Sequence, residues 1–311
     1  MRILTALAIL LALSVLSLFV GVIDLSTDAE AWSLVAVSRF PRTAAALITG
    51  ASLAVAGAIM QLLARNRFVE PMTAGTGQGA ALGILLVTIF APSASLGMKM
   101  LLASSTALIT SFGFLVIVRR LPVTQHILVP LVGLVYGGLI GAGVTFVAFQ
   151  SDLLQYIEIW MSGEFSGILQ GRYELLWIAA IVAIASYLVA DQFAILGMGK
   201  SVSLNLGLNY DHIVLLGLLV VSVVTALTVV VVGMIPFVGL VVPNIVSRLM
   251  GDDLRSTLPT IAALGAGLVL ACDIAGRLVR YPFEIPVGTI LGVIGTCVFL
   301  WLLFAKPRHA A

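Results

Sequence analysis

Two short glycine-containing motifs hold residue types that bind phosphate groups in nucleotide-binding proteins. The Gly-Lys-Ser sequence at 199–201 has the ending of a phosphate-binding loop, but Ala194 occupies the position of that loop's first glycine, and an apolar helix instead of a strand is predicted before it. The glycine-rich sequence at 75–79 lacks the glycine order of a dinucleotide-binding turn and the βαβ pattern around it. We therefore expect that this chain hydrolyses no nucleotide by itself.

Side chains that could hold a metal or act in catalysis are scattered along the chain. His126, His212 and His309 lie near the ends of predicted helices, and Cys272 and Cys297 fall inside apolar runs. A metal site or a catalytic triad needs such residues at spacings that bring them together, and the sequence shows no such spacing. We expect no metal site, no cofactor and no enzyme activity.

Three glycines, Gly133, Gly137 and Gly141, recur at a spacing of four in one apolar run. This spacing places them on one face of a helix, where the absence of side chains allows another helix to approach closely. Close helix packing is one interpretation. The other is that the smooth face lines a path for a bulky solute, and both stay open.

The elements that carry these residues are predicted to be membrane helices. The chain has 61% apolar and 10% charged residues, against about 25% charged residues in soluble domains. Its apolar runs are continuous and about 20 residues long, which is the length of a membrane-crossing helix. The net charge is only +2 and no basic block is present, so a nucleic-acid partner is not expected. The composition predicts an all-α integral membrane protein.

We predict about ten transmembrane helices in a single domain over residues 1–311. The longest apolar stretch is divided into two spans at Gly233 and Pro236, because these residues interrupt a helix. The predicted spans are Ile3–Ile23, Thr43–Leu63, Gly75–Phe90, Met100–Val118, Ile127–Phe149, Leu175–Ala194, Ile213–Val232, Ile235–Met250, Thr257–Ala275 and Pro286–Ala305.

The distribution of basic residues predicts that both termini are cytoplasmic in an inner (plasma) membrane. With this orientation ten of the 16 Lys and Arg residues lie inside, as the positive-inside rule favours. An outer loop at 150–174 is rich in acidic residues and is predicted to hold a short interfacial helix. Six basic residues remain outside: Arg39, Arg42, Lys99, Arg172, Arg277 and Arg280.

Motifs over most of the chain resemble the FecCD family, the permease subunits of ABC importers for iron-siderophore complexes, haem and vitamin B12. Two departures are Arg67-Phe68, where family members commonly have Pro-Leu, and Asn244, where they commonly have His. The motifs are Arg-Phe-Pro-Arg at 39–42, the small-residue run at 50–58, Arg-Asn at 65–66 with Pro71, Gly-Gln-Gly-Ala at 77–80, Trp-Met-Ser-Gly at 160–163, the segment 237–244, Asp273 with Arg277, and the segment 284–288.

The resemblance implies the fold of a vitamin B12 importer permease and a role for the outer arginines. A periplasmic or lipid-anchored substrate-binding protein would dock through acidic side chains onto Arg39, Arg42 and Arg277. The alternative for Arg277 is an ion pair with Asp273, four residues earlier on the same helix face. The alternative for Arg39 and Arg42 is simple interfacial placement beside Pro41.

The resemblance also implies partners at the cytoplasmic side. The segment 197–212 is similar to the two short helices through which such permeases contact ABC ATPase subunits, and an ordinary loop is the alternative. A second permease, identical or similar, would complete the path across the membrane. The residues implied in this coupling are Gly199, Lys200, Ser203, Leu206 and Gly207.

The function implied is import of a ferric siderophore, with vitamin B12 or haem as alternatives. A different class, the ion-coupled secondary transporter, would call for ionisable residues buried near mid-membrane. Asp273 is the strongest candidate for such a residue, and Asp191 and Glu284 lie near the ends of predicted spans. A purely structural membrane anchor does not account for the many charges and glycines at specific spacings.

Overall fold

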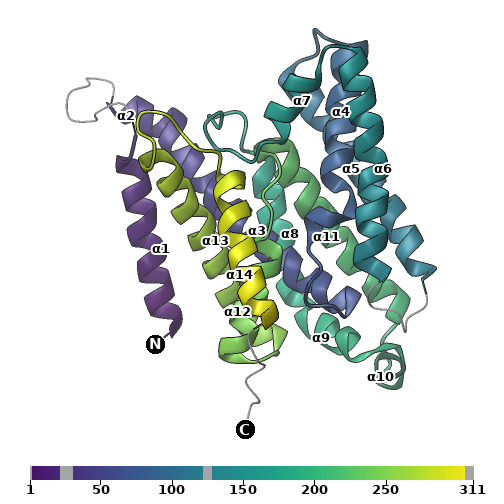
Figure 1. Cartoon of the computed structure of the whole chain (residues 1–311). Coiled ribbons are helices and arrows are strands. Elements are labelled where there is room, and N and C mark those ends of the chain that lie inside the picture. Colours follow the sequence, from purple (N-terminus) through teal and green to yellow (C-terminus); the bar gives the residue numbers. More distant parts are fainter. Residues whose placement is uncertain (1, 22–30, 122–127, 305–311) are drawn as a thin grey trace.

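The computed structural model describes residues 2–21, 31–121 and 128–304, and Figure 1 shows an arrangement of helices over these ranges. The elements are α1 (Arg2–Phe19), α2 (Ala31–Leu34), the π-helix η1 (Val35–Arg39), α3 (Phe40–Ala64), the 3₁₀ helix η2 (Pro71–Ala74), α4 (Thr76–Phe90), α5 (Leu96–Arg119), α6 (Leu128–Gln150), α7 (Leu154–Met161), α8 (Leu175–Leu188), α9 (Ala190–Met198), α10 (Lys200–Asn205), α11 (Tyr210–Val232), α12 (Val238–Met250), α13 (Leu254–Leu278) and α14 (Val287–Phe304).

Each predicted span corresponds to an apolar helix or helix pair, although the boundaries Ile23, Ile127 and Ala305 lie outside the described residues. Within the described part of the chain, five helices are long and apolar enough to cross a membrane alone, and the bent pair α8–α9 makes a sixth. The remaining four predicted spans form shorter apolar helices. The long helices are Trp32–Ala64, Leu96–Val118, Leu131–Gln150, Tyr210–Val232 and Leu254–Leu278.

One predicted break and one predicted loop helix are confirmed, and one bend was not predicted. The chain leaves α11 at Gly233, whose φ is 88°, and α12 begins only after Phe237. The helix predicted in the 150–174 loop is α7. The sixth predicted span, expected to be one straight helix, is bent, because α8 ends at Leu188 and α9 continues to Met198 at an angle of 66°. Hydropathy could not reveal this bend, since α9 also buries apolar side chains inside the protein.

Side-chain caps begin three of the helices. Ser95, Asn209 and Asp253 accept hydrogen bonds from the backbone N–H groups of the first turns of α5, α11 and α13. A hydrogen bond with the Ser256 side chain is the largest cause that holds the pKa of Asp253 below its usual range. These caps define where the chain re-enters a helix after a loop.

The helix α3 lies at the centre of the bundle and packs against α8, α11, α12 and α13. A Cβ atom added at Gly50 would overlap the carbonyl oxygen of Gly265 on α13, and one added at Gly57 would overlap Gly239 on α12. The backbones are therefore in direct contact at both crossings, as small residues permit in membrane proteins.

Two ends of the bundle can be distinguished in Figure 1. The helix α7, the start of α3 and the end of α13 lie at one end, which we call the outer end. The helices α9 and α10, the start of α1 and the end of α14 lie at the opposite end, which we call the inner end.

The glycine contacts of α3 generate a first prediction. The Gly57→Ala variant should lower the stability of the folded protein by about 1–3 kcal/mol, because the new methyl group has no space against Gly239. Thermal unfolding in detergent measures the change. Gly143→Ala on α6 is the matched control, since a Cβ there meets no atom within 4 Å. Equal melting temperatures for the two variants would contradict the close contact.

Candidate functional site

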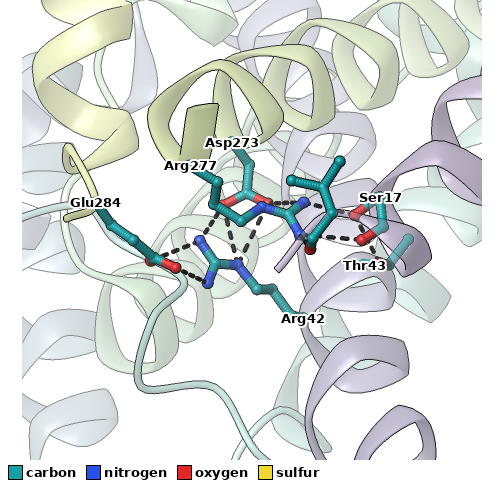
Figure 2. A network of polar contacts seen from close by, with 7 residues as sticks. Ser17, Arg42, Thr43, Asp273, Arg277 and Glu284 are labelled. Carbon is teal, nitrogen blue, oxygen red and sulfur yellow. Dashed lines mark hydrogen bonds and ion pairs between the residues drawn. The ribbon is translucent and has the colours of Figure 1, made fainter. Parts of the chain in front are cut away.

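Four charged side chains from α3, α13 and the loop after α13 form an ionic network at the outer end (Figure 2). Asp273 is fully buried, and its carboxylate binds Arg42 Nη2 at 2.8 Å and Arg277 Nη2 at 2.7 Å. Arg42 also donates to Glu284, whose side chain is 33% exposed, at 2.9 Å. Two positive and two negative charges therefore share one site, and each buried charge has a partner of opposite sign.

Local sequence explains why these side chains meet. Arg42 lies in the first turn of α3 directly after Pro41, and proline is favoured at a helix start because its fixed φ suits the first turn. Asp273 and Arg277 are one helical turn apart on α13, which places them on the same face. Glu284 follows the end of α13 and reaches back to Arg42.

The network extends to α1 through Arg277. Its Nη1 atom donates to the carbonyl oxygens of Ser17 and Val20 at 3.0 and 2.8 Å, and its Nη2 atom donates to Ser17 Oγ at 2.7 Å. The Ser17 hydroxyl is in turn 2.8 Å from the hydroxyl of Thr43 on α3. These carbonyls belong to the last turn of α1 and the residue after it, where a cation is favourable. The network thus joins α1, α3 and α13.

The predicted docking residues have different surroundings. Arg277 is only 6% exposed, and the alternative weighed for it, the ion pair with Asp273, is present. Arg42 has a side chain that is 13% exposed and lies between Asp273 and Glu284. Arg39 is partly exposed and donates to the carbonyl oxygen of Leu18 at 2.9 Å. The structure brings Arg42 and Arg277 to one carboxylate, and docking stays a prediction for all three arginines.

The predicted segment 197–212 holds the end of α9, all of α10 and the start of α11, so the first short helix begins earlier than predicted, at Ala190. We call Ala190–Gly207 the coupling segment, and the five predicted coupling residues lie in it at the inner end. Gly199 joins α9 to α10 with φ of 121°, and Gly207 follows α10 with φ of 79°, so both positions favour glycine. Lys200, Leu206 and Gly207 are exposed. The coupling role of these residues stays a prediction.

Ser203 does not share this exposure. It is 1% exposed, and its Oγ atom donates to the carbonyl oxygen of Gly199 at 2.8 Å. Its side chain therefore closes the turn between α9 and α10 and does not face outward. The sequence could not show this, because a six-residue helix has too few turns to reveal which face is buried.

The glycines predicted for the translocation path lie on the face of α6 that is turned toward η2 and α4. Gly133 and Gly137 are buried. A Cβ atom at Gly137 would be 3.4 Å from Gly75 Cα, and one at Gly141 would be 3.3 Å from Gln78 Cγ. These contacts are those of close helix packing, the other interpretation of the spacing. A path-lining role stays a prediction.

A buried carboxylate that sequence reasoning missed lies between α3 and η2. Glu70 is 8% exposed, and its Oε2 atom accepts a hydrogen bond from the backbone N–H of Phe237 at 2.8 Å. Phe237 has φ of 69° and directly precedes α12, so Glu70 satisfies a free N–H group at the start of that helix. Glu70 and Phe237 are 167 residues apart, so no pattern of neighbouring residues in the sequence predicts this contact.

The ionic network generates a second prediction. The Asp273→Ala variant should lower the free energy of unfolding by about 3–5 kcal/mol, because it leaves Arg277 and Arg42 without their shared buried partner. The matched control is Asp252→Ala, which breaks the Arg67–Asp252 pair. Both of its side chains are more than half exposed, so that loss should be about 1 kcal/mol or less. Denaturant unfolding of the purified proteins compares them, and similar losses would refute a special role for the buried carboxylate.

Comparisons with known proteins agree with this architecture. The model of the FecCD transport family matches residues 4–305. A solved inward-facing structure of a transporter assigned to the metal-chelate type of ABC transporter superimposes with a TM-score of 0.87 at 23% identity, and the match covers 97% of this chain and 98% of that one. The structural likeness supports the fold.

Two relatives extend the comparison to sequence. The petrobactin import system permease protein YclN of Bacillus subtilis (strain 168) is 44% identical over 309 residues, which cover 97% of this chain and 98% of the relative. The petrobactin import system permease protein FatD of Bacillus anthracis is 40% identical over 303 residues, which cover 97% of this chain and 91% of the relative. Since both the family match and these similarities extend over nearly the whole sequence, the chain belongs to the FecCD transport family.

Proposed function

We propose that this chain is the membrane-spanning subunit of a binding-protein-dependent ABC importer and that its cargo is a ferric siderophore. The observation that carries this proposal is the near-full-length similarity to permeases named for petrobactin import. Petrobactin is a siderophore, and its ferric complex is therefore the first cargo to test. Vitamin B12 and haem are the alternatives within the same kind of importer.

The inner end supports the contact with ATPase subunits. Met198, Val202, Leu204 and Leu206 of the coupling segment are 66%, 36%, 54% and 60% exposed. Exposed apolar side chains that gather on one short segment typically mark a protein interface. Two ATPase subunits beneath a pair of permeases would cover this surface, and ATP binding and hydrolysis would bias the permeases between outward-open and inward-open states.

The outer end supports docking of a substrate-binding protein. Glu284 is the more exposed of the two carboxylates that bind Arg42. An acidic side chain of a docking protein can compete with Glu284 for this guanidinium while Asp273 keeps its buried contacts. Arg39, on the preceding turn, would add a second positive charge to the same surface. Charge pairs of this kind accelerate encounter and set orientation.

A second permease, identical or similar, would complete the path. The face of α6 opposite the buried glycines exposes Leu134, Val135 and Leu139, which are 64%, 65% and 74% exposed. This face would meet either lipid or the second permease. Gly133, Gly137 and Gly141 would then support the path by holding α6 close to α4, whether or not they touch the cargo.

Reconstitution in liposomes tests the proposal. The chain is purified with its ATPase and partner permease and is supplied with a binding protein loaded with ferric petrobactin. Accumulation of iron inside the vesicles should require both ATP and the binding protein. Uptake driven by an ion gradient without ATP would overturn the proposal in favour of a secondary transporter, and uptake of haem or vitamin B12 in place of the siderophore would correct the cargo.

The coupling segment generates a third prediction. Leu204→Asp should weaken copurification of the ATPase by about 30-fold, which is the effect of losing an interface hot spot worth about 2 kcal/mol. Asn205→Asp is the matched control, because it adds the same charge at a neighbouring exposed position without removing an apolar contact. Pull-down of the ATPase from detergent-solubilised membranes gives the readout. Equal recovery with both variants would remove Leu204 from the interface. Ser203 is unsuitable for this test because its side chain is buried.

A further inference from the structure

Arg65 ends α3 with an unusual backbone conformation. Its φ is 47°, in the left-handed region, and its N–H and that of Asn66 bond back to the carbonyl oxygens of Leu62 and Gln61. Two such hydrogen bonds commonly end a helix, and the residue in the left-handed conformation is usually glycine. A residue with a side chain in this conformation costs about 1 kcal/mol or more. An arginine at this position therefore suggests that its side chain has a use.

The Arg65 guanidinium lies against the joint between the two helices of the coupling segment. A Cβ atom added at Gly199 would be 3.4 Å from both Nη1 and Nη2 of Arg65 and 3.5 Å from its Cζ. Gly197, two residues earlier, also lies against α3, because a Cβ atom added there would be 2.9 Å from Leu62 Cδ2. The end of α3 and the joint of α9 and α10 are thus in direct contact.

The electrostatics of this contact favour a cation. Gly199 follows the last residue of α9, and the carbonyl groups at the end of a helix carry partial negative charge. Arg65 Nη2 is buried and has no hydrogen-bond partner in this arrangement. Arg65 also borders a cavity of about 300 Å³ that Gly197 and Asn244 line as well. Arg65 therefore has an unused donor at the border of this cavity and next to the end of α9.

We infer that Arg65 is a positioning residue through which a displacement of the coupling segment is transmitted to α3. This inference rests on the proposed function, because the displacement would come from the ATPase subunits. The coupling segment is joined to α8 by a 66° bend at Val189, and the inference requires that the segment tilts about this joint. When α9 and α10 tilt, the Arg65 contact moves the end of α3 with them.

The rest of α3 can carry this movement to the outer end. It has 25 residues, and a helix of that length spans about 37 Å. Its backbone is in direct contact with α12 at Gly57 and with α13 at Gly50, so a shift of α3 would carry both helices with it at these crossings. Arg42 and Asp273, at the far ends of α3 and α13, would then shift together.

The Arg65→Gly variant tests this inference. Glycine adopts the left-handed conformation without strain, so the helix end should remain intact while the guanidinium is lost. In liposomes with the ATPase, the binding protein and a ferric siderophore, the amount of cargo imported per ATP hydrolysed should fall by about tenfold, within the usual range of coupling between two sites. The melting temperature of the purified permease should stay at or above the wild-type value.

Two further variants make the test specific. Arg67→Gly removes a neighbouring arginine whose side chain is 57% exposed and pairs with Asp252, and it should leave the ratio of import to hydrolysis within about twofold of wild type, as expected for a surface pair. Arg65→Lys keeps a cation near the end of α9 and should restore most of the ratio. An Arg65→Gly permease with an unchanged ratio would overturn the inference, as would an equal loss in Arg67→Gly. If the wild-type complex itself imports nothing with ATP, the proposed function fails instead.

Discussion

The direct contact of the α3 backbone with its neighbours is the constraint on which the rest of the structure depends. Glycines at both crossings, Gly50 against Gly265 and Gly57 against Gly239, remove the side chains that would otherwise separate the helices. Because dispersion contacts fall off steeply with distance, packing this close is a main source of stability where no water is displaced between helices. It also fixes the axial position of α3 relative to α12 and α13, so charged groups at the ends of these helices face one another in a fixed register.

The outer ionic network follows from this register. A buried carboxylate such as that of Asp273 is tolerated only when charge and hydrogen bonds compensate for its lost hydration. Arg277 lies on the same helix as Asp273, but Arg42 lies on α3 and reaches Asp273 only if α3 and α13 are aligned along their axes. The close contacts of Gly50 and Gly57 fix this alignment. The network in turn holds α1, whose last carbonyl groups bind Arg277, against the two central helices. The docking proposed at this end would use Arg42 and Glu284, the more exposed members of the network, together with Arg39 beside them.

The sequence predicted features that depend on neighbouring residues and missed those that depend on distant ones. Hydropathy identified ten apolar helices, and Gly233 with Pro236 predicted the break before α12. The spacing of four residues, about one helical turn, indicates the Asp273–Arg277 pair as an alternative to docking. Arg42 and Asp273 are 231 residues apart, so a single sequence carries no signal for their contact. The bend after Leu188 was missed because α9 is also apolar, and the inward side chain of Ser203 was missed because α10 is too short to show a periodic pattern.

The ion pairs at the two ends of the bundle differ in burial, and this difference bears on where the proposed ATPase subunits would act. At the outer end the shared carboxylate is fully buried and binds two guanidinium groups. At the inner end the ion pairs of Arg67 and Arg255 are about half exposed, so each contributes about 1 kcal/mol or less. Glycines bound α10 on both sides and permit rotation there. A force applied to the coupling segment therefore deforms the inner end first. The helix α3 is free of proline beyond its first turn and is enclosed by its neighbours, which suits it to carry the inferred displacement to the outer end.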